Sequence, residues 1–366
     1  MSERTPLGQR LPDFPWDTIA DVKARAAAHP DGLIDLSVGT PVDAVDPSIQ
    51  LALAENAAAP GYPQTAGTPE LRDAISAALE RRYGAAGLDR DSVLPVIGTK
   101  EAIAWLPTTL GLRPGSTVVI PEVAYPTYEV GALIAGCEVV RSDEPVNGAS
   151  LVFVNSPSNP TGRVRGVDEM RRWVRFARDT GAVIASDECY MGLAWSAEPV
   201  SVLDPRVTDG DNTNLLAIHS LSKTSNMASY RAGFFAGDAR LIRELLLVRK
   251  HAGLIVPGPV QHAMVAALSA DEHEQLQRLT YAKRRATLLK ALVDAGFAVD
   301  NSEAGLYLWA RREGANSRET LAWLAERGVL AAPGDFYGPA GAAHVRIALT
   351  ATDEHIAAAA ERLSHS

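Results

Sequence analysis

The middle of the chain alternates short, nearly continuous apolar runs with longer segments of helical pattern. The runs LVFV at 151–154 and AVIAS at 182–186 have no polar face, which is typical of strands covered on both sides. The predicted strands are Thr117–Pro121, Glu138–Arg141, Leu151–Asn155, Ala182–Asp187, Asn214–His219 and Ala232–Gly237. The predicted helices are Glu101–Leu110, Thr127–Ala135, Val167–Thr180 and Asp238–Lys250. This alternation predicts an α/β fold with a mainly parallel central sheet and helices on both faces.

The last hundred residues follow a different pattern. Their predicted helices are Asp271–Ala295, Arg318–Arg327 and Asp353–Arg362, and their predicted strands are Leu306–Ala310 and His344–Leu349. This mixture predicts a smaller α+β domain. We expect an N-terminal segment of residues 1–45 that packs with it, a large domain of residues 46–260 and a small C-terminal domain of residues 261–366.

Composition and charge exclude several classes of protein. With 46% apolar and 22% charged residues, the chain resembles an ordinary globular protein and not a disordered one. A net charge of −9 argues against nucleic acid or an anionic membrane as a partner. Cys137 and Cys189 lie far apart and outside any Cys/His cluster, so we expect no zinc module and a reducing compartment. The polar start and the lack of a long apolar run predict a cytoplasmic protein without a membrane span.

Polar side chains recur where the predicted strands end, and open α/β sheets bind their ligands at the carboxyl ends of strands. Thr99 and Lys100 begin a predicted helix, where free N–H groups favour an anion. The other members of this set are Tyr125, Asn159, Asp187, Tyr190, Ser220, Ser222, Lys223 and Arg231. Their joint placement predicts one ligand site at this edge of the sheet.

The segment SLSKTSNMASYRAG at 220–233 resembles the lysine-attachment signature of the class I/II aminotransferases. Four further motifs follow the order of that family: YPQTAGTPELR at 62–72, NPTG at 159–162, DECY at 187–190 and HVRI at 344–347. The resemblance implies the pyridoxal-phosphate transferase fold of type I, with pyridoxal 5′-phosphate bound by the large domain. Four other stretches are similar to actinobacterial N-succinyldiaminopimelate aminotransferases: FPWDT at 14–18, GTKEAIAW at 98–105, DECYMG at 187–192 and HSLSKT at 219–224.

The resemblance implies a role for each residue around the cofactor ring. Lys223 would attach the cofactor aldehyde and later carry a proton, and burial beside Arg231 would lower its pKa from about 10.4. Asp187 would pair with the protonated ring nitrogen, although a capping Asp at a helix start would look the same in sequence. Tyr190 and Asn159 would donate to the phenolic oxygen, Asn159 being otherwise a turn residue. Tyr125 would stack on the ring or, alternatively, be a core aromatic.

The remaining implied roles concern the phosphate, the substrate and a second subunit. The phosphate would be held by Thr99, Lys100, Ser220, Ser222 and Arg231, and Thr99 could instead cap its helix. Tyr62 would reach the phosphate of a neighbouring subunit in a homodimer with shared active sites, unless it is a plain loop residue. Arg346, Asn159 and the backbone of Gly39 would bind the substrate α-carboxylate, and a turn glycine is the alternative for Gly39.

Two stretches depart from the family pattern, so the pattern does not predict which substrate side chain is accepted. Glu303 stands where the family often has proline, with Gly305 kept, and Val42–Asp43 replaces a common aromatic. Both are expected near the substrate entrance.

The expected reaction is succinyldiaminopimelate transamination, a step of lysine biosynthesis. It exchanges an amino group between N-succinyl-LL-2,6-diaminopimelate and 2-oxoglutarate, and acidic donors should be preferred. The alternatives are transamination of aspartate, alanine or aromatic amino acids, and a pyridoxal-phosphate β-lyase on the same fold. A ligand-sensing regulator is disfavoured by the lack of a basic patch.

Overall fold

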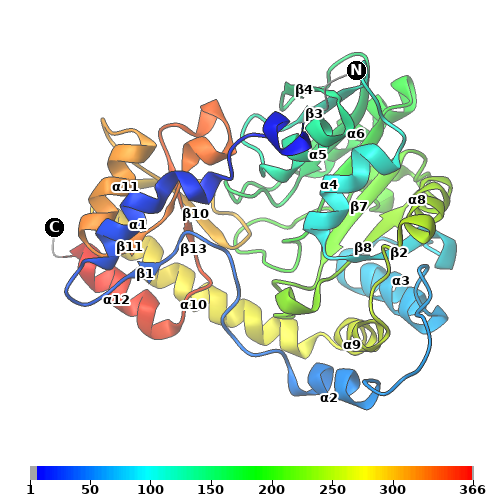
Figure 1. Cartoon of the computed structure of the whole chain (residues 1–366), viewed down its shortest axis with the longest axis horizontal. Helices are drawn as coiled ribbons and strands as arrows, with labels where there is room; N and C mark the ends of the chain where they lie inside the picture. Colours follow the sequence, from blue (N-terminus) through cyan, green and yellow to red (C-terminus); the bar gives the residue numbers. More distant parts are fainter. Residues whose placement is uncertain (1–5, 365–366) are drawn as a thin grey trace.

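A computed structural model describes residues 6–364 of the chain and shows two parts side by side (Figure 1). The larger part is built on a seven-stranded sheet with the strand order β2-β8-β7-β6-β5-β3-β4. These strands are β2 (Val93–Ile97), β3 (Thr117–Ile120), β4 (Glu138–Arg141), β5 (Ala149–Asn155), β6 (Val183–Asp187), β7 (Leu215–Ser220) and β8 (Ala232–Gly237). Strands β3 to β7 pair in parallel, and β8 runs antiparallel to both β7 and β2. The mainly parallel sheet is therefore confirmed.

Strand β2 was missed by the sequence analysis. Its sequence VLPVI contains Pro95, and a proline within an apolar run argues against a strand. The structure places β2 at the edge of the sheet, paired only with β8, where a missing backbone N–H is tolerated.

Both faces of the large sheet are covered by helices. Val152 and Val154 of β5 pack in one hydrophobic core with α3 (Pro69–Tyr83), α6 (Val167–Thr180) and α9 (Gly258–Ser269). Leu151 and Phe153 of the same strand pack in another core with α4 (Thr99–Thr109), α5 (Thr127–Ala135) and α8 (Ala239–Ala252). Successive side chains of a strand point to opposite faces, so a strand buried on both sides reads as a continuous apolar run.

The smaller part holds a four-stranded antiparallel sheet with the order β12-β13-β10-β9. Its strands are β9 (Phe297–Asp300), β10 (Tyr307–Arg312), β12 (Ala332–Pro333) and β13 (Val345–Ala348). The helices of this part are α10 (Glu272–Asp294), α11 (Ser317–Glu326) and α12 (Asp353–Ser364). Figure 1 shows α10 extending from beside α9 in the large part into the small part.

The N-terminal segment joins both parts. Its strand β1 (Ile34–Asp35) pairs in parallel with β11 (Val329–Leu330), and α1 (Ala20–Ala27) lies against α11. Before that, Arg10 donates to the carbonyl of Leu133 on α5, so the first described residues touch the large part. The domain limits at 45 and 260 stay predictions, and residues 1–5 and 365–366 of the predicted outer segments lie outside the described residues.

The remaining elements are short or peripheral. Helix α2 (Pro47–Glu55) packs against α9, and α7 (Pro205–Thr208) packs against α6. The 3-10 turns are Leu7–Arg10, Pro15–Ile19, Arg90–Ser92, Ala228–Tyr230, Gly334–Tyr337 and Pro339–Gly341. Between residues 6 and 364, no helix is both long and apolar enough to cross a membrane.

Candidate active site

A cavity of about 770 Å³ lies at the carboxyl ends of β6 and β7, facing the small part. Every residue predicted to belong to the site lines this cavity except Tyr62. They come from three regions: Gly39 from the N-terminal segment, Arg346 from β13 of the small part, and the others from the large part. Apart from Tyr62, the residues predicted from motifs that are distant in sequence therefore lie around a single cavity.

Lys223 follows β7 and is half-buried, with its amine inside the cavity. The amine donates a hydrogen bond to the carbonyl oxygen of Gly39. Burial lowers the pKa of Lys223 from its ordinary value of 10.5, and the positive charges of Arg346 and Arg231 lower it further, against the opposing effect of Tyr307. A larger share of the amine is therefore uncharged near neutral pH than in a free lysine, as a nucleophile requires.

Asp187 ends β6 and is 5% exposed. Its Oδ2 accepts a hydrogen bond of 2.6 Å from the hydroxyl of Tyr128, and its Oδ1 accepts one of 3.2 Å from the backbone N–H of Cys189. Burial raises the pKa of Asp187, and these two hydrogen bonds oppose that rise. No helix begins here, since the next one along the described chain starts at Pro205, so the capping alternative is wrong.

Arg346 is buried and faces the cavity from β13. Its Nη1 donates to Oδ1 of Asn159 at 3.0 Å, its Nη2 donates to the carbonyl of Ser37 at 2.7 Å, and its guanidinium lies 3.9 Å from the centre of the Tyr307 ring. It has no carboxylate partner within residues 6–364, and its buried Nε has no hydrogen-bond partner there. A buried guanidinium without an acid favours an anionic ligand.

Arg231 lines the cavity, and Gly98 packs against its guanidinium. Gly98 precedes α4 with φ of 74°, and a Cβ at this position would collide with the guanidinium of Arg231. Thr99 is the first residue of α4 and does not cap it, so the capping alternative for its side chain is wrong. Ser220 accepts a hydrogen bond of 3.1 Å from the N–H of Ser222 beside them. Hydroxyls, a guanidinium and a helix start form a set of donors that suits a phosphate.

The charged side chains that line the cavity are mostly cationic. Among the described residues that line it, Asp187 is the sole carboxylate, and the cations are Lys100, Lys223, Arg231 and Arg346. The chain as a whole carries a net charge of −9. Residues of this kind fit pyridoxal phosphate, with a doubly charged phosphate at one end and a cationic ring nitrogen at the carboxylate.

Two tyrosines of the site were missed by the sequence analysis. Tyr307 begins β10, and its hydroxyl lies 3.2 Å from that of Tyr190. A Cβ on Gly39 would collide with the hydroxyl and ring of Tyr307, so Gly39 is a site of close approach and not an ordinary turn glycine. Tyr128 lies in the first turn of α5, three residues after Tyr125, and this short spacing is the signal that could have found it.

The cavity entrance also contains aromatic residues that the sequence motifs did not assign to it. Phe14 and Trp16 line the cavity with ring centres 5.6 Å apart, and Trp16 lies 5.4 Å from Phe336 of the small part. Lys100 lies 5.7 Å from the Phe14 ring. The N-terminal segment therefore forms one wall of the site.

The two departures from the family pattern do not line the cavity. Glu303 accepts a hydrogen bond of 2.7 Å from the N–H of Val164. Asp43 binds Arg284 of α10 through two contacts of 2.7 Å, while the neighbouring Val42 is exposed. Both carboxylates hold loops in place, and the expectation that the two stretches lie near the substrate entrance stays a prediction.

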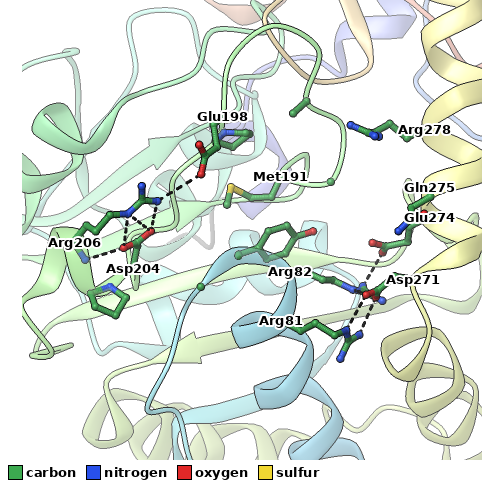
Figure 2. Close-up of a pocket in the computed structure, with 16 residues that line it drawn as sticks. Arg81, Arg82, Met191, Glu198, Asp204, Arg206, Asp271, Glu274, Gln275 and Arg278 are labelled. Atoms are coloured by element: carbon green, nitrogen blue, oxygen red, sulfur yellow. Dashed lines mark hydrogen bonds and ion pairs between the residues drawn. The ribbon is translucent and has the colours of Figure 1, made fainter.

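A second cavity of about 810 Å³ lies between α3, α10 and the loop after β6 (Figure 2). Ion pairs line it: Arg81 pairs with Asp271 at 2.8 Å, Arg82 with Glu274 at 2.9 Å, and Arg206 with Asp204 at 2.7 Å. None of the predicted site residues lines this cavity. We therefore place the candidate active site around Lys223.

Comparison with known proteins identifies the family. The model of the class I and II aminotransferases matches residues 31–363. The chain belongs to this family. The aminotransferase is 64% identical over 358 residues to a probable aminotransferase of Mycobacterium tuberculosis, covering 97% of this chain and 85% of that protein. It is 54% identical to 4-dedimethylamino-4-oxo-anhydrotetracycline transaminase OxyQ of Streptomyces rimosus, covering 97% and 100% of the two chains.

Solved structures agree with this assignment. A probable N-succinyldiaminopimelate aminotransferase from Thermus thermophilus superposes with a TM-score of 0.87 at 29% identity, covering 96% of this chain and 100% of that one. The expected aspartate-aminotransferase fold is confirmed, as is the membership of a family that depends on pyridoxal phosphate. The aminotransferase thus acts on amino acids and keto acids.

The close approach at Gly39 yields a first prediction. Gly39→Ala should lower kcat/KM about a hundredfold, because the new methyl group displaces Tyr307 or the backbone that accepts from Lys223. Gly166→Ala is the matched control, since a Cβ there meets no atom within 4 Å. Steady-state kinetics of the two variants check it, and equal rates would contradict the tight packing described here.

The lowered pKa of Lys223 yields a second prediction. Below the folded-state pKa, folding must bury a charged amine, and this penalty disappears as the pH rises to the ordinary value of 10.5. In cofactor-free protein, Lys223→Met should therefore raise stability near pH 7, and the gain should shrink as the pH approaches 10. Denaturant unfolding at several pH values measures it, with the exposed Lys250→Met as control. A gain that does not change with pH would contradict the lowered pKa.

Proposed function

We propose that this aminotransferase exchanges an amino group between N-succinyl-LL-2,6-diaminopimelate and 2-oxoglutarate in the cavity around Lys223. The observation that supports the site is the buried guanidinium of Arg346, which lines the same cavity as Lys223 and has no acidic partner among residues 6–364. An α-carboxylate there would bring the substrate α-carbon to the lysine. The diaminopimelate assignment is supported by the likeness to the Thermus thermophilus protein.

Bound pyridoxal phosphate supplies an electron-accepting ring that stabilises negative charge at the substrate α-carbon. We assign the ring nitrogen to Asp187, the ring face to Tyr125, and the phenolic oxygen to Asn159 and Tyr190. Each of these side chains lines the cavity. A carboxylate at Asp187 paired with the ring nitrogen would keep that nitrogen protonated, so the ring would draw electrons more strongly.

Residues of the chain itself bind the substrate and transfer the proton. Arg346 and Asn159 hold the substrate α-carboxylate, with the backbone of Gly39 closing over it. Lys223 would attach the cofactor through its amine. Once the amine of the substrate has replaced it there, the freed Lys223 amine would take the proton from the substrate α-carbon and deliver it to the cofactor carbon to which Lys223 had been attached. Its lowered pKa suits both tasks near neutral pH.

The phosphate is assigned to Thr99, Lys100, Ser220, Ser222 and Arg231, which all line the cavity. We further propose a homodimer, since the side chain of Tyr62 is 99% exposed in a single chain and would contact the phosphate of its partner. A cytoplasmic location is proposed because Cys137 and Cys189 are both free thiols.

A second candidate substrate is a ketone on a fused-ring skeleton. The relative from Streptomyces rimosus is named for such a reaction and is 54% identical. The wall formed by Phe14 and Trp16 offers aromatic faces on which a planar substrate could stack.

A test of the reaction follows the cofactor absorbance of purified enzyme. Glutamate should convert the pyridoxal spectrum to the pyridoxamine spectrum, 2-oxoglutarate should reverse the change, and Lys223→Ala should not cycle. In a panel of donors, N-succinyl-LL-2,6-diaminopimelate and other acidic donors should have the highest kcat/KM. A preference for aromatic or neutral donors would contradict the named pair, and release of pyruvate and ammonia from cystathionine would favour the β-lyase alternative.

The shared site yields a prediction of its own. The variants Lys223→Ala and Tyr62→Ala should each have reduced transaminase activity. Lys223→Ala lacks the amine that attaches the cofactor, and Tyr62→Ala lacks a contact to the phosphate. When the two variants are mixed and allowed to exchange subunits, each mixed dimer regains one site with both residues intact. Activity of the mixture should then exceed the sum of the separate activities. No gain, despite exchange shown by native mass spectrometry, would mean that Tyr62 serves its own subunit or none.

A further inference from the structure

Tyr128 contacts Asp187, the carboxylate that lines the cavity, from outside the cavity. Its hydroxyl donates a hydrogen bond of 2.6 Å to Oδ2 of Asp187, and its side chain is fully buried. Tyr128 itself does not line the cavity, so it cannot touch a substrate there. Its hydrogen bond to the site is made to Asp187, and its ring also meets that of Tyr125, which lines the cavity.

The ring of Tyr128 is held so that its hydroxyl can point in one direction only. On one side it stacks on Phe153 of β5, with ring centres 4.6 Å apart and planes 15° apart. Tyr125 meets it edge-on, with ring centres 5.6 Å apart. Strand β5 lies next to β6, which ends in Asp187, so the stack fixes the distance from the ring to the carboxylate.

The hydroxyl acts as a donor in this contact. Burial raises the pKa of Tyr128 well above its usual range, and the negative charge of Asp187 raises it further, so the hydroxyl keeps its proton. The other titratable groups that interact with Asp187 are Cys189, which follows it in sequence, Tyr125 before α5 and His219 on β7. Among these groups, Tyr128 is the one whose side-chain hydroxyl donates to a carboxylate oxygen.

We propose that Tyr128 is a positioning residue that, acting through Asp187, keeps a proton on the ring nitrogen of the bound cofactor. This inference rests on the proposed pairing of Asp187 with that nitrogen. A carboxylate that accepts a strong hydrogen bond is less basic, so the proton between it and the ring stays on the ring. Without Tyr128, the carboxylate becomes more basic and draws this proton toward itself, and the ring attracts electrons less strongly.

The change can be followed in the visible spectrum of the holoenzyme. A positively charged ring repels a second proton at the point where the cofactor is attached to Lys223, so it lowers the pH at which the absorbance changes. Tyr128→Phe should move this midpoint upward by about one pH unit. In the same variant, kcat should fall about tenfold while KM changes little, because the effect acts on the reacting ring and not on substrate binding.

Two further variants distinguish failure of this inference from failure of the assigned role of Asp187. Asp187→Asn, at saturating cofactor, should move the midpoint at least as far or prevent stable binding of the cofactor. Tyr337→Phe is the matched control, since Tyr337 is fully buried and its hydroxyl has no hydrogen-bond partner within residues 6–364. This control should leave the midpoint in place.

An unchanged midpoint in Tyr128→Phe, with a clear effect in Asp187→Asn, would overturn the inference and leave the proposed function standing. An unchanged midpoint in both variants would overturn the assignment of Asp187 and the inference together. An equal shift in Tyr337→Phe would overturn the inference as well, because loss of a buried hydroxyl would then suffice.

Discussion

The site depends on an imbalance of charge in a confined space. Among the described residues, four cationic side chains and one carboxylate line the cavity around Lys223. Arg346 is held there by an amide oxygen and a backbone carbonyl and not by an acid, so its charge remains available to a ligand. Such an arrangement is costly when empty and becomes favourable when an anionic cofactor and an anionic substrate are bound.

The fold explains how these groups come together. The parallel strands deliver Asp187 and Lys223 to one edge of the large sheet, while β13 supplies Arg346 from the small part. The N-terminal segment closes the space from a third side with Gly39 and two aromatic rings. The site is therefore complete only where the three regions of the chain meet.

Much of this could be predicted from the sequence. The parallel strands were visible because continuous apolar runs distinguish strands buried on both faces, and the cavity residues were visible through motifs that follow those strands. Strand β2 was hidden by Pro95, whose edge position no local pattern reveals. Tyr307 and Tyr128 were hidden because their importance lies in contacts with Gly39 and Asp187, which are distant in sequence. The partners of Glu303 and Asp43 were hidden for the same reason, since they too are distant in sequence.

The central claim is that the amine of Lys223 holds the cofactor. Reduction of the holoenzyme with borohydride, followed by proteolysis and mass spectrometry, tests this most directly, because it makes the attachment permanent. The account predicts that the peptide containing Lys223 carries the mass of the reduced cofactor and that no other lysine does. Recovery of the cofactor on a different lysine, or on none, would contradict it.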